Sequence, residues 1–583
     1  MWYSELVEVY EKIEATTKRL EMTEYLVELF KKTPSALIDK VVYLTQGRLY
    51  PEFVGIELGL AEKLALRALA NAAGIPLKSV EGEAKKVGDV GLAAENILKK
   101  KKQATLFSGR LDVETVYSTL DKIARTTGEG SVDIKIKLLS GLLADATPKE
   151  AKYLMRTVTG RLRLGVADMT ILDALAVAFA DKEQRELVER AYNITSDLGY
   201  VAKLLAEEGL EGLKRCKITV GRPIRMMLAQ RLTSAKEVLE KLGGRAACEF
   251  KYDGERIQLH KKGDEILLFS RRLENITMQY PDVVEAARRC ILAEEAIVEG
   301  ECVAVDPDTG DFLPFQELMH RRRKYGIERA VKEFPASFFL FDALYDGEDL
   351  TQKPYPERRR RLEAMVKEEE SFRLSEMITS DDVNEIERFF ELAIENGCEG
   401  LMLKSVAEDS IYQAGARGWL WIKLKRSYQS KMIEPIDVVV VGAFMGKGRR
   451  AGTYGALLVA VYDDDRDIFP TICKLGSGFS DKDLEDLPKI LEPHKIEHKH
   501  PRVESSMEAD VWFTPAVVLE IIGDELTLSP IHTCAFNKIR EGAGIAVRFP
   551  RFTGRFREDK APEDATTVKE IIEMYQAQLK KID

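Results

Sequence analysis

The chain has 583 residues, of which 45% are hydrophobic and 32% charged, and its formal net charge is −10 at neutral pH. This length predicts roughly three to four domains, and the composition predicts a soluble globular protein without a membrane span, which we expect in the cytoplasm. The negative charge argues mildly against a nucleic-acid partner, but such binding depends on local basic patches. The seven scattered cysteines form no Cys-x-x-Cys pair, which excludes a cysteine zinc finger.

Residues 1–215 are predicted to be helical. Apolar residues recur there at i, i+3 and i+4, for example in the segments 26–30 and 64–69, and β-branched runs are few. Turns centred on glycine, such as the one at Gly47, separate the predicted helices.

A basic turn bounded by glycines lies late in this helical region. Arg161 and Arg163 stand between Gly160 and Gly165, shortly before a helix expected to begin at Thr170. Amides and guanidiniums exposed in such a turn would bind backbone phosphates without reading bases. A charged loop between two helices remains the alternative for either arginine.

Over residues 216–426 the sequence pattern changes to one that predicts short strands. Three of them, Ala246–Phe250, Arg256–His260 and Glu265–Ser270, are predicted to form a meander, with turn residues around Gly263 closing its second hairpin. This pattern indicates an antiparallel sheet for the middle of the chain.

Residues 427–583 are predicted to form a third region that is mostly β. It begins with a strongly β-branched strand at 436–441 and ends with a helix from Thr567 to Lys581. Between them, a glycine-rich hairpin presents the basic residues Lys447 and Arg449.

The segment around Lys251 carries the most specific chemical signal. Strand alternation places Glu249, Lys251 and Asp253 on one face. A lysine that attacks a phosphate must be neutral, which at pH 7 costs an ordinary lysine roughly 4.6 kcal/mol. We expect neighbouring cations and a bound Mg²⁺ to lower its pKa. A surface Lys–Asp pair in a hairpin is the alternative for this motif taken alone.

Paired acids follow downstream. Glu299 and Glu301 are spaced i, i+2 on one face of a strand, and carboxylates that face a phosphate site need Mg²⁺ between them and it. A solvated sheet edge is disfavoured because the flanking residues are apolar. Glu399 adds a further acid, just before Lys404.

Two more strands are predicted beyond the paired acids. The aromatic-rich segment 338–344 is predicted to be core, with one ring stacking on a base. The segment 419–425 alternates, so that its aliphatic residues face one side while Trp421, Lys423 and Lys425 face the other, as in a phosphate-binding wall.

Three basic runs, 99–102, 321–324 and 358–361, are interpreted as solvated faces rather than binding sites. Next to the first run, Gln103–Phe107 resembles a shortened sliding-clamp-binding peptide, and an ordinary loop end is an equal alternative.

Taken in order, these segments resemble the six motifs of the covalent nucleotidyltransferase superfamily, and they are most similar to ATP-dependent DNA ligases of the archaeal and eukaryotic type. The motifs are KYDGER, SRRLE, EGECVAVD, FFLFDALY, CEGLMLK and WLWIKLK. The resemblance implies a multidomain α and α+β/β fold. It consists of an all-helical DNA-binding domain over 1–215, an antiparallel-sheet adenylation domain over 216–426 and a C-terminal OB-fold β-barrel with a helix over 427–583.

The resemblance also implies roles for individual residues. Lys251 would be the nucleophile, Glu249 the acceptor for the adenine amino group and Phe341 the ring that stacks on adenine. Glu301 and Glu399 would bind metal. The residues that would bind the nucleotide are Glu249, Arg256, Arg271, Glu301, Phe341, Arg417, Lys423, Lys425, Arg557 and Lys560. The residues that would bind DNA are Arg161, Arg163, Lys447 and Arg449.

The implied function is ATP-dependent and Mg²⁺-dependent sealing of nicked double-stranded DNA, by a monomer, in replication, repair and recombination. Four alternatives remain: an RNA ligase, an RNA-capping guanylyltransferase, an NAD-dependent ligase and a non-catalytic DNA-binding or clamp-tethered scaffold. The helical first third argues against the first two. The missing cysteine zinc finger argues against the NAD-dependent enzyme. The non-catalytic scaffold is disfavoured because all the residues that the reaction requires are present in the motifs.

Overall fold

The computed structural model describes residues 1–100, 110–162, 164–232, 234–305, 312–313, 315–321, 326–396, 398–425, 434–446, 452–523, 525–529, 531–548 and 550–580. Within these ranges, residues 182, 316, 391, 394, 395, 425, 579 and 580 are described by their backbone alone. The chain divides into two compact units. The first unit consists of residues 1–231 and 235–423, and the second of residues 232–234 and 424–583.

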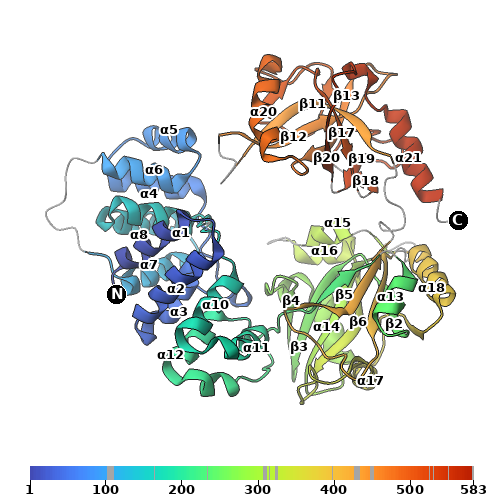
Figure 1. Cartoon of the computed structure of the whole chain (residues 1–583), viewed down its shortest axis with the longest axis horizontal. Helices are drawn as coiled ribbons and strands as arrows, with labels where there is room; N and C mark the ends of the chain where they lie inside the picture. The colour runs from blue at the N-terminus through green and yellow to red at the C-terminus, as the bar shows by residue number, and fades with distance from the viewer. Residues whose placement is uncertain are drawn as a thin grey trace. The chain divides into compact units, whose positions relative to one another are not determined.

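The described part of residues 1–215 folds into helices, as predicted (Figure 1). The α-helices are α1 (Tyr3–Glu14), α2 (Arg19–Lys32), α3 (Ile38–Thr45), α4 (Glu62–Ala73), α5 (Leu77–Val87), α6 (Val90–Lys99), α7 (Val113–Arg125), α8 (Ser131–Asp145), α9 (Pro148–Val158), α10 (Asp168–Phe179), α11 (Arg185–Thr195) and α12 (Leu198–Lys214). Their apolar faces form one core that runs from Tyr3 to Leu213.

Helix α9 shows how the local sequence fixes these helices. Thr147 accepts a hydrogen bond from the backbone of Glu150, whose side chain bonds back to the amide of Thr147 at 2.7 Å. This capping box, with Pro148 in the first turn, starts the helix. The helix ends at Val158, and Gly160 then turns the chain with φ of 67° toward Arg161.

Residues 216–425 form two five-stranded sheets, in the orders β1-β10-β9-β2-β8 and β4-β3-β5-β6-β7. The strands are β1 (Leu228–Arg231), β2 (Ala246–Lys251), β3 (Glu255–Lys262), β4 (Glu265–Ser270), β5 (Glu295–Ala304), β6 (Ala336–Tyr345), β7 (Phe372–Leu374), β8 (Met377–Ser380), β9 (Gly400–Ser405) and β10 (Arg417–Lys425). The helices are α13 (Ala235–Lys241), α14 (Pro281–Cys290), α15 (Phe315–Leu318), α16 (Ile327–Glu333), α17 (Tyr355–Met365) and α18 (Val383–Glu395). Most pairings are antiparallel, but β1 with β10 and β6 with β7 are parallel.

The predicted three-stranded meander is wrong in one pairing. The hairpin of β3 and β4 exists, with Lys262 opposite Glu265 across Gly263. Strand β2, however, pairs with β8 and β9 in the other sheet. The chain crosses between the sheets at Gly254, where an added Cβ would lie 2.2 Å from the carbonyl oxygen of Cys302. Nearly all of β2 is buried, so its hydrophobic pattern could not distinguish between the two pairings.

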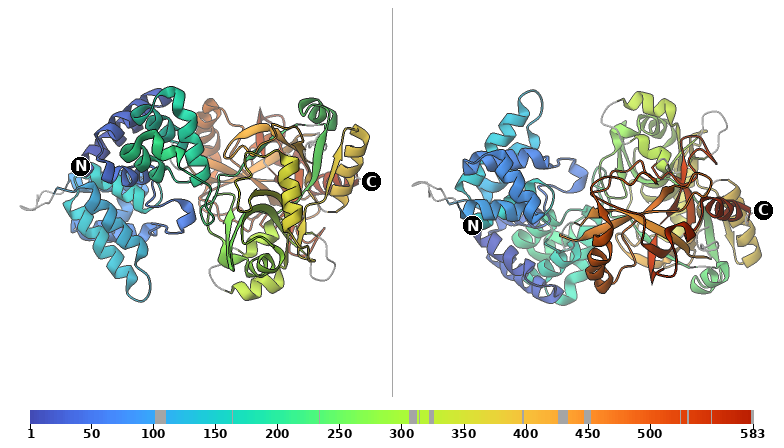
Figure 2. Two further views of the ribbon diagram at one scale, coloured as in Figure 1. Left: turned by 90° about the horizontal axis from the view of Figure 1, so that it is seen from below. Right: turned by 90° about the horizontal axis from the view of Figure 1, so that it is seen from above.

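The second unit contains an OB-like β-sheet, as expected. Strand β11 is central, since it pairs with β12, β16 and β17, and β17 in turn pairs with β20. The strands are β11 (Ile436–Met445), β12 (Tyr454–Ala460), β13 (Phe469–Leu475), β14 (Lys495–Ile496), β15 (Val503–Glu504), β16 (Val511–Phe513), β17 (Val518–Ile522), β18 (Glu525–Ser529), β19 (Gly544–Arg548) and β20 (Arg551–Phe556). The helices are α20 (Asp481–Leu491) and α21 (Val568–Lys580), and Figure 2 shows both beside these strands.

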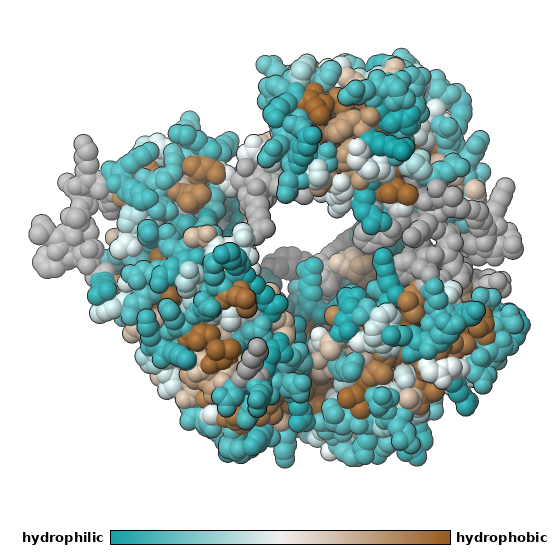
Figure 3. Space-filling view, in the orientation of Figure 1, coloured by the Kyte–Doolittle hydropathy of each residue, from teal (hydrophilic) through white to brown (hydrophobic). Residues whose placement is uncertain are grey.

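The surface is mainly hydrophilic on the face seen in Figure 3, with hydrophobic residues in small patches. Among the described residues, no helix is both long and apolar enough to cross a membrane.

Candidate active site

Lys251 stands at the end of β2, where its side chain meets an acid from the neighbouring strand. Its Nζ lies 2.7 Å from Oε2 of Glu399. The pairing of β2 with β9 places the two residues together, because Lys251 is opposite Gly400 and its carbonyl oxygen accepts the amide of Glu399 at 2.8 Å. The predicted nucleophile and a predicted metal ligand are thus direct neighbours.

Acids, rather than cations, surround Lys251. Burial alone lowers the pKa of Lys251, but the carboxylates of Glu399 and Glu301 outweigh it and raise the pKa above its ordinary value. The expectation that neighbouring cations lower this pKa is therefore wrong for this structure. The lysine is the protonated partner of Glu399.

Glu301 extends the acidic cluster. Burial raises the pKa of Glu301 to about 7, with Lys251 and Arg256 acting in the opposite direction and Glu399 and Asp253 adding to the rise. A carboxyl group held among other carboxylates in this way has unfavourable charge that a cation would relieve. Carboxylate oxygens are the donors that Mg²⁺ prefers, so Glu301 and Glu399 fit such an ion.

Glu299 has different surroundings from Glu301. Its side chain is fully buried, which excludes the solvated-edge alternative. It accepts hydrogen bonds from Arg256 at 2.7 Å, from the Tyr412 hydroxyl at 2.9 Å and from Gln258 at 3.1 Å. Arg256 also donates to the carbonyl oxygen of Met227 at 2.7 Å. Glu299 therefore orients Arg256.

The predicted base-binding residues lie beside this cluster. Glu249 is buried, and its Oε2 lies 2.8 Å from Nζ of Lys404. The ring of Phe341 has two cations near its centroid, the guanidinium of Arg256 at 5.4 Å and Nζ of Lys404 at 4.7 Å. The aromatic strand β6 is largely core, as predicted, and Phe341 is its half-buried exception near the site.

The remaining predicted nucleotide contacts within residues 216–425 differ in their exposure. Arg271 is exposed after β4, and Arg417 is exposed at the start of β10, where it donates to the carbonyl oxygen of Ala229 at 3.3 Å. Lys423 is half-buried on β10, and the side chain of Lys425 lies outside the described atoms.

Strand β10 is buried at one residue of its predicted lysine face, Trp421. This ring was expected to share the lysine face, but it is buried and packs edge-on against Phe341 and Tyr412, with centroid distances of 6.1 and 5.8 Å. A neighbouring cation, Lys404, lies 4.5 Å from its centroid. The face opposite the aliphatic residues therefore lies partly against Phe341, a predicted base-binding residue.

The interpretation of two basic runs as solvated faces is wrong for the residues Arg321, Arg358 and Arg359, whereas Arg360 is exposed and residues 322–324 lie outside the described part of the chain. Arg321 is fully buried and forms a two-pronged pair with Asp282, at 2.8 and 2.7 Å. Arg358 is fully buried against Asp342, and Arg359 is buried next to it. Sequence reasoning missed Arg359 and Tyr355, although their spacing with Arg358 after Pro354 marks one helix face.

In the second unit, the two predicted phosphate-binding cations share one acid. Asp437 of β11 accepts Arg557 at 3.0 Å and Lys560 at 2.6 Å. Arg557 also pairs with Asp559 at 2.9 Å. The structure thus brings these two cations together.

Among the predicted DNA contacts, Arg161 is half-exposed and pairs with Glu62 at 2.6 Å. Arg163, Lys447 and Arg449 lie outside the described residues, as does the clamp-like segment Gln103–Phe107.

Three family models match the chain, and together they cover most of its length. They are the DNA ligase N terminus over residues 2–176, the ATP-dependent DNA ligase domain over residues 226–425 and the ATP-dependent DNA ligase C-terminal region over residues 450–560.

Several known proteins are similar over their full length. The chain is 60% identical to a protein named DNA ligase 2 from Thermofilum pendens, covering 99% of this chain and 98% of that one. It is 56% identical to a DNA ligase from Staphylothermus marinus, covering both completely, and 55% identical to a probable DNA ligase from Aquifex aeolicus, covering 100% and 99%. A solved structure titled "Pmar-Lig_Pre." shares the fold with a TM-score of 0.54 at 18% identity, covering 95% of this chain and 99% of that one. With these matches added to the lysine site and its flanking acids, the chain belongs to the family of ATP-dependent DNA ligases.

Proposed function

We propose that this chain seals nicks in double-stranded DNA, joining a 5′-phosphate to a 3′-hydroxyl through a covalent lysyl–AMP intermediate on Lys251. One observation supports this above all. A half-buried lysine at the end of β2 lies 2.7 Å from Glu399, and the carboxylate of Glu301 also raises the pKa of this lysine. This combination provides an amine nucleophile next to acids that suit a metal-bound nucleotide.

The first step forms the intermediate. The neutral Nζ of Lys251 attacks the α-phosphorus of ATP, a nitrogen–phosphorus bond forms, and the bond to the β-phosphate breaks to release pyrophosphate. Glu249 would accept the adenine amino group and Phe341 would stack on the base. Arg256 and Arg271 would contact ribose and phosphate. This assignment is supported by the resemblance of the surrounding segments to the motifs of the nucleotidyltransferase superfamily.

The remaining phosphate contacts would come from cations of strand β10 and of the C-terminal region. On β10 these are Arg417, Lys423 and Lys425. From the second unit, Arg557 and Lys560 would stabilise the leaving pyrophosphate. Cations placed where charge develops lower the barrier without covalent help.

Glu301 and Glu399 would hold Mg²⁺. When bound, the ion would neutralise phosphate charge and polarise the phosphoryl group. Lys251 must leave Glu399 before it can attack, because the pair holds its proton.

The two later steps use DNA. An oxygen of the nick's 5′-phosphate attacks the AMP phosphorus and frees Lys251, and the 3′-hydroxyl then attacks the activated 5′-phosphate and expels AMP. Arg161, Arg163, Lys447 and Arg449 would bind the duplex backbone. A role in replication, repair and recombination, a monomeric state, a cytoplasmic location and a clamp contact through Gln103–Phe107 stay predictions.

We also propose three domains with the boundaries 1–215, 216–426 and 427–583. The end of α12 at Lys214 supports the first boundary, and the division between the two compact units near residue 424 supports the second.

Incubation of the full chain with radiolabelled ATP, GTP or NAD, followed by a denaturing gel, tests the proposal. Label from ATP alone, with sealing of nicked DNA, is the expected result. Label from GTP would indicate a capping-type enzyme, label from NAD an NAD-dependent ligase, and sealing of RNA alone an RNA ligase. No label from any of the three would indicate a non-catalytic protein.

A further inference from the structure

Helix α17 brings three buried polar side chains under the base site. Tyr355, Arg358, Arg359 and Leu362 follow the spacing i, i+3, i+4 and i+7, and all four are buried. Buried positions on a helix are usually occupied by apolar residues. The polar residues on this face must therefore be paired, and their partners show what the helix does.

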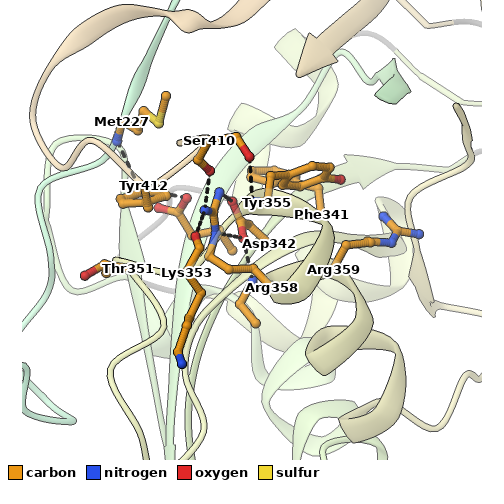
Figure 4. A network of polar contacts seen from close by, with 12 residues as sticks. Met227, Phe341, Asp342, Thr351, Lys353, Tyr355, Arg358, Arg359, Ser410 and Tyr412 are labelled. Carbon is orange, nitrogen blue, oxygen red and sulfur yellow. Dashed lines mark hydrogen bonds and ion pairs between the residues drawn. The ribbon is translucent and has the colours of Figure 1, made fainter. Parts of the chain in front are cut away.

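Arg358 attaches the helix to β6. Its Nε donates to Asp342 at 2.8 Å, and its Nη1 donates to the carbonyl oxygens of Lys353 at 2.7 Å and Ser410 at 2.8 Å. Figure 4 shows the Arg358 and Asp342 side chains meeting beside Ser410. Both side chains of the ion pair are fully buried. Because Asp342 directly follows Phe341, this pair fixes α17 relative to the predicted base-stacking ring.

The other two polar residues of this face reach Glu249. The Tyr355 hydroxyl donates to Oε1 of Glu249, and Nη1 of Arg359 lies 3.6 Å from the same oxygen. Arg359 is itself held by the hydroxyl and the carbonyl oxygen of Ser375, at 2.9 and 3.0 Å. The backbone amide of Tyr355 donates to Ser410 at 3.0 Å. Neither side chain is therefore free to move away from Glu249 on its own.

Lys404 completes the surroundings of this carboxylate. Its Nζ lies 2.8 Å from Oε2 of Glu249 and donates to the carbonyl oxygen of Phe341 at 3.2 Å. The rings of Phe341, Tyr355 and Trp421 lie within 4.7 Å of the same nitrogen. Glu249 thus has two basic side chains and one hydroxyl around it in the protein interior.

An ionised carboxylate accepts hydrogen bonds and donates none, and its two oxygens offer about four acceptor directions. Tyr355 and Lys404 use one direction on each oxygen, so acceptor capacity remains for a ligand. A purine with an amino group at C6 can donate to it, whereas a purine with a carbonyl oxygen at C6 would place two acceptors against each other. A rigid acceptor discriminates more strongly between these bases than a mobile one.

We propose that Tyr355 is a positioning residue for nucleotide specificity: through Glu249, its hydroxyl selects a nucleotide that carries a 6-amino group. The inference rests on the proposed function, because it takes Glu249 as the acceptor for the adenine amino group. It assigns no chemical step to Tyr355.

The test compares Tyr355→Phe with Tyr280→Phe in the full chain. Both substitutions delete one buried tyrosine hydroxyl that donates to a glutamate, since Tyr280 donates to Glu255 at 2.6 Å. Intact-protein mass spectrometry follows the rate of adduct formation with ATP and with purine riboside triphosphate, which lacks the 6-amino group. The rates give KM and kcat for each nucleotide.

Tyr355→Phe is expected to raise KM for ATP by about tenfold, with kcat nearly unchanged, because one fixed hydrogen bond to the base is weakened. KM for the analogue should stay the same. In a Glu249→Gln background the substitution should have little further effect, since the two residues act as a unit. Tyr280→Phe should leave the ratio of the two KM values unchanged.

Equal KM increases for ATP and the analogue, or no change for either, would overturn the inference. Arg359→Gln should show the same selectivity in a smaller degree, which keeps the test valid if Tyr355→Phe does not fold. Absence of any adduct between the wild-type protein and ATP would instead refute the proposed function. An adduct with wild type but no selective effect of either variant would refute only the role of Tyr355.

Discussion

Nζ of Lys251 lies 2.7 Å from Oε2 of Glu399, so the proposed nucleophile and a proposed metal ligand are each other's partners. Both groups would exchange partners if nucleotide and metal bind as proposed. The carboxylate of Glu399 raises the pKa of Lys251, so a metal ion that takes over Glu399 would remove this effect and allow the lysine to lose its proton.

Glu399→Gln should slow self-adenylation on the order of 100-fold, and the Mg²⁺ concentration needed for half-maximal rate should rise, because a charged ligand becomes neutral. The measurement is the rate of ATP labelling across a MgCl₂ titration. Glu408→Gln, an exposed acid on the segment after β9, is the control and should behave as wild type. An unchanged Mg²⁺ requirement in Glu399→Gln would contradict the metal assignment.

Removing both arginines of the basic turn, by Arg161→Ala with Arg163→Ala, should weaken binding to nicked DNA without slowing self-adenylation. The slope of log K against log salt should flatten by about 0.9 for each phosphate that is no longer neutralised. Fluorescence anisotropy at several salt concentrations measures this slope. Arg125→Ala, which removes a half-exposed arginine paired with Asp121, is the matched control. If the slope stays the same, the turn is an ordinary charged loop.

Lys560→Ala should separate the steps of the reaction. Labelling by ATP should fall on the order of 100-fold, because a cation that stabilises the leaving pyrophosphate is lost. Sealing of a pre-adenylated nick should survive, since no pyrophosphate leaves in that step. Lys569→Ala, an exposed lysine paired with Asp464 and Asp465, serves as the control. Normal labelling combined with failed sealing of the pre-adenylated nick would identify Lys560 as a DNA contact instead.

His260 should make the protein sensitive to acid. Its ring is fully buried, with Nδ1 accepting the amide of Gly221 at 3.0 Å and Nε2 lying 2.9 Å from Oε1 of Gln258, and burial lowers its pKa to about 3. The unfolded chain takes up this proton near pH 6.5 and the folded protein only near pH 3. The stability that depends on neutral His260 is therefore complete above pH 6.5 and is lost as the pH falls, by about 1.4 kcal/mol per unit.

The measurement is guanidinium unfolding at pH 7 and pH 4.5. Wild type should lose about 2.7 kcal/mol more between these values than His260→Gln, which has no titrating group at this position. The exposed His498, replaced by Gln, is the control and should match wild type. Equal losses in wild type and His260→Gln would show that His260 does not control acid stability.

The sequence was sufficient for the type of each region but not for the partners of its strands. Periodic apolar residues predicted the helices up to Lys214, and alternation predicted the hairpin of β3 and β4. The pairing of β2 was missed because its residues are buried whichever sheet it joins. Pairing between strands far apart in the chain depends on three-dimensional packing that local periodicity does not encode.

The residues of the candidate site were also predictable only in part. Lys251, Glu301 and Glu399 could be found because short motifs surround them, and the structure places them together. Arg358 was taken as solvated because a run of arginines is usually exposed. Arg358 is buried because it pairs with Asp342, whose Oδ1 lies 2.8 Å from its Nε. Asp342 is 16 residues away in the sequence, so the spacing of residues does not predict this contact. Tyr355 has no motif at all, and only its hydrogen bond to Glu249 reveals it.

The most direct test of the proposed function is covalent labelling by α-³²P-ATP in wild type and Lys251→Ala. Wild type should retain label on a denaturing gel and Lys251→Ala should retain none, because only the amine forms the nitrogen–phosphorus bond. Lys262→Ala, an exposed lysine at the end of the next strand, should label normally. Lys251→Ala should still seal a pre-adenylated nick, which shows that its fold is intact. Equal labelling of wild type and Lys251→Ala would contradict the lysyl–AMP mechanism.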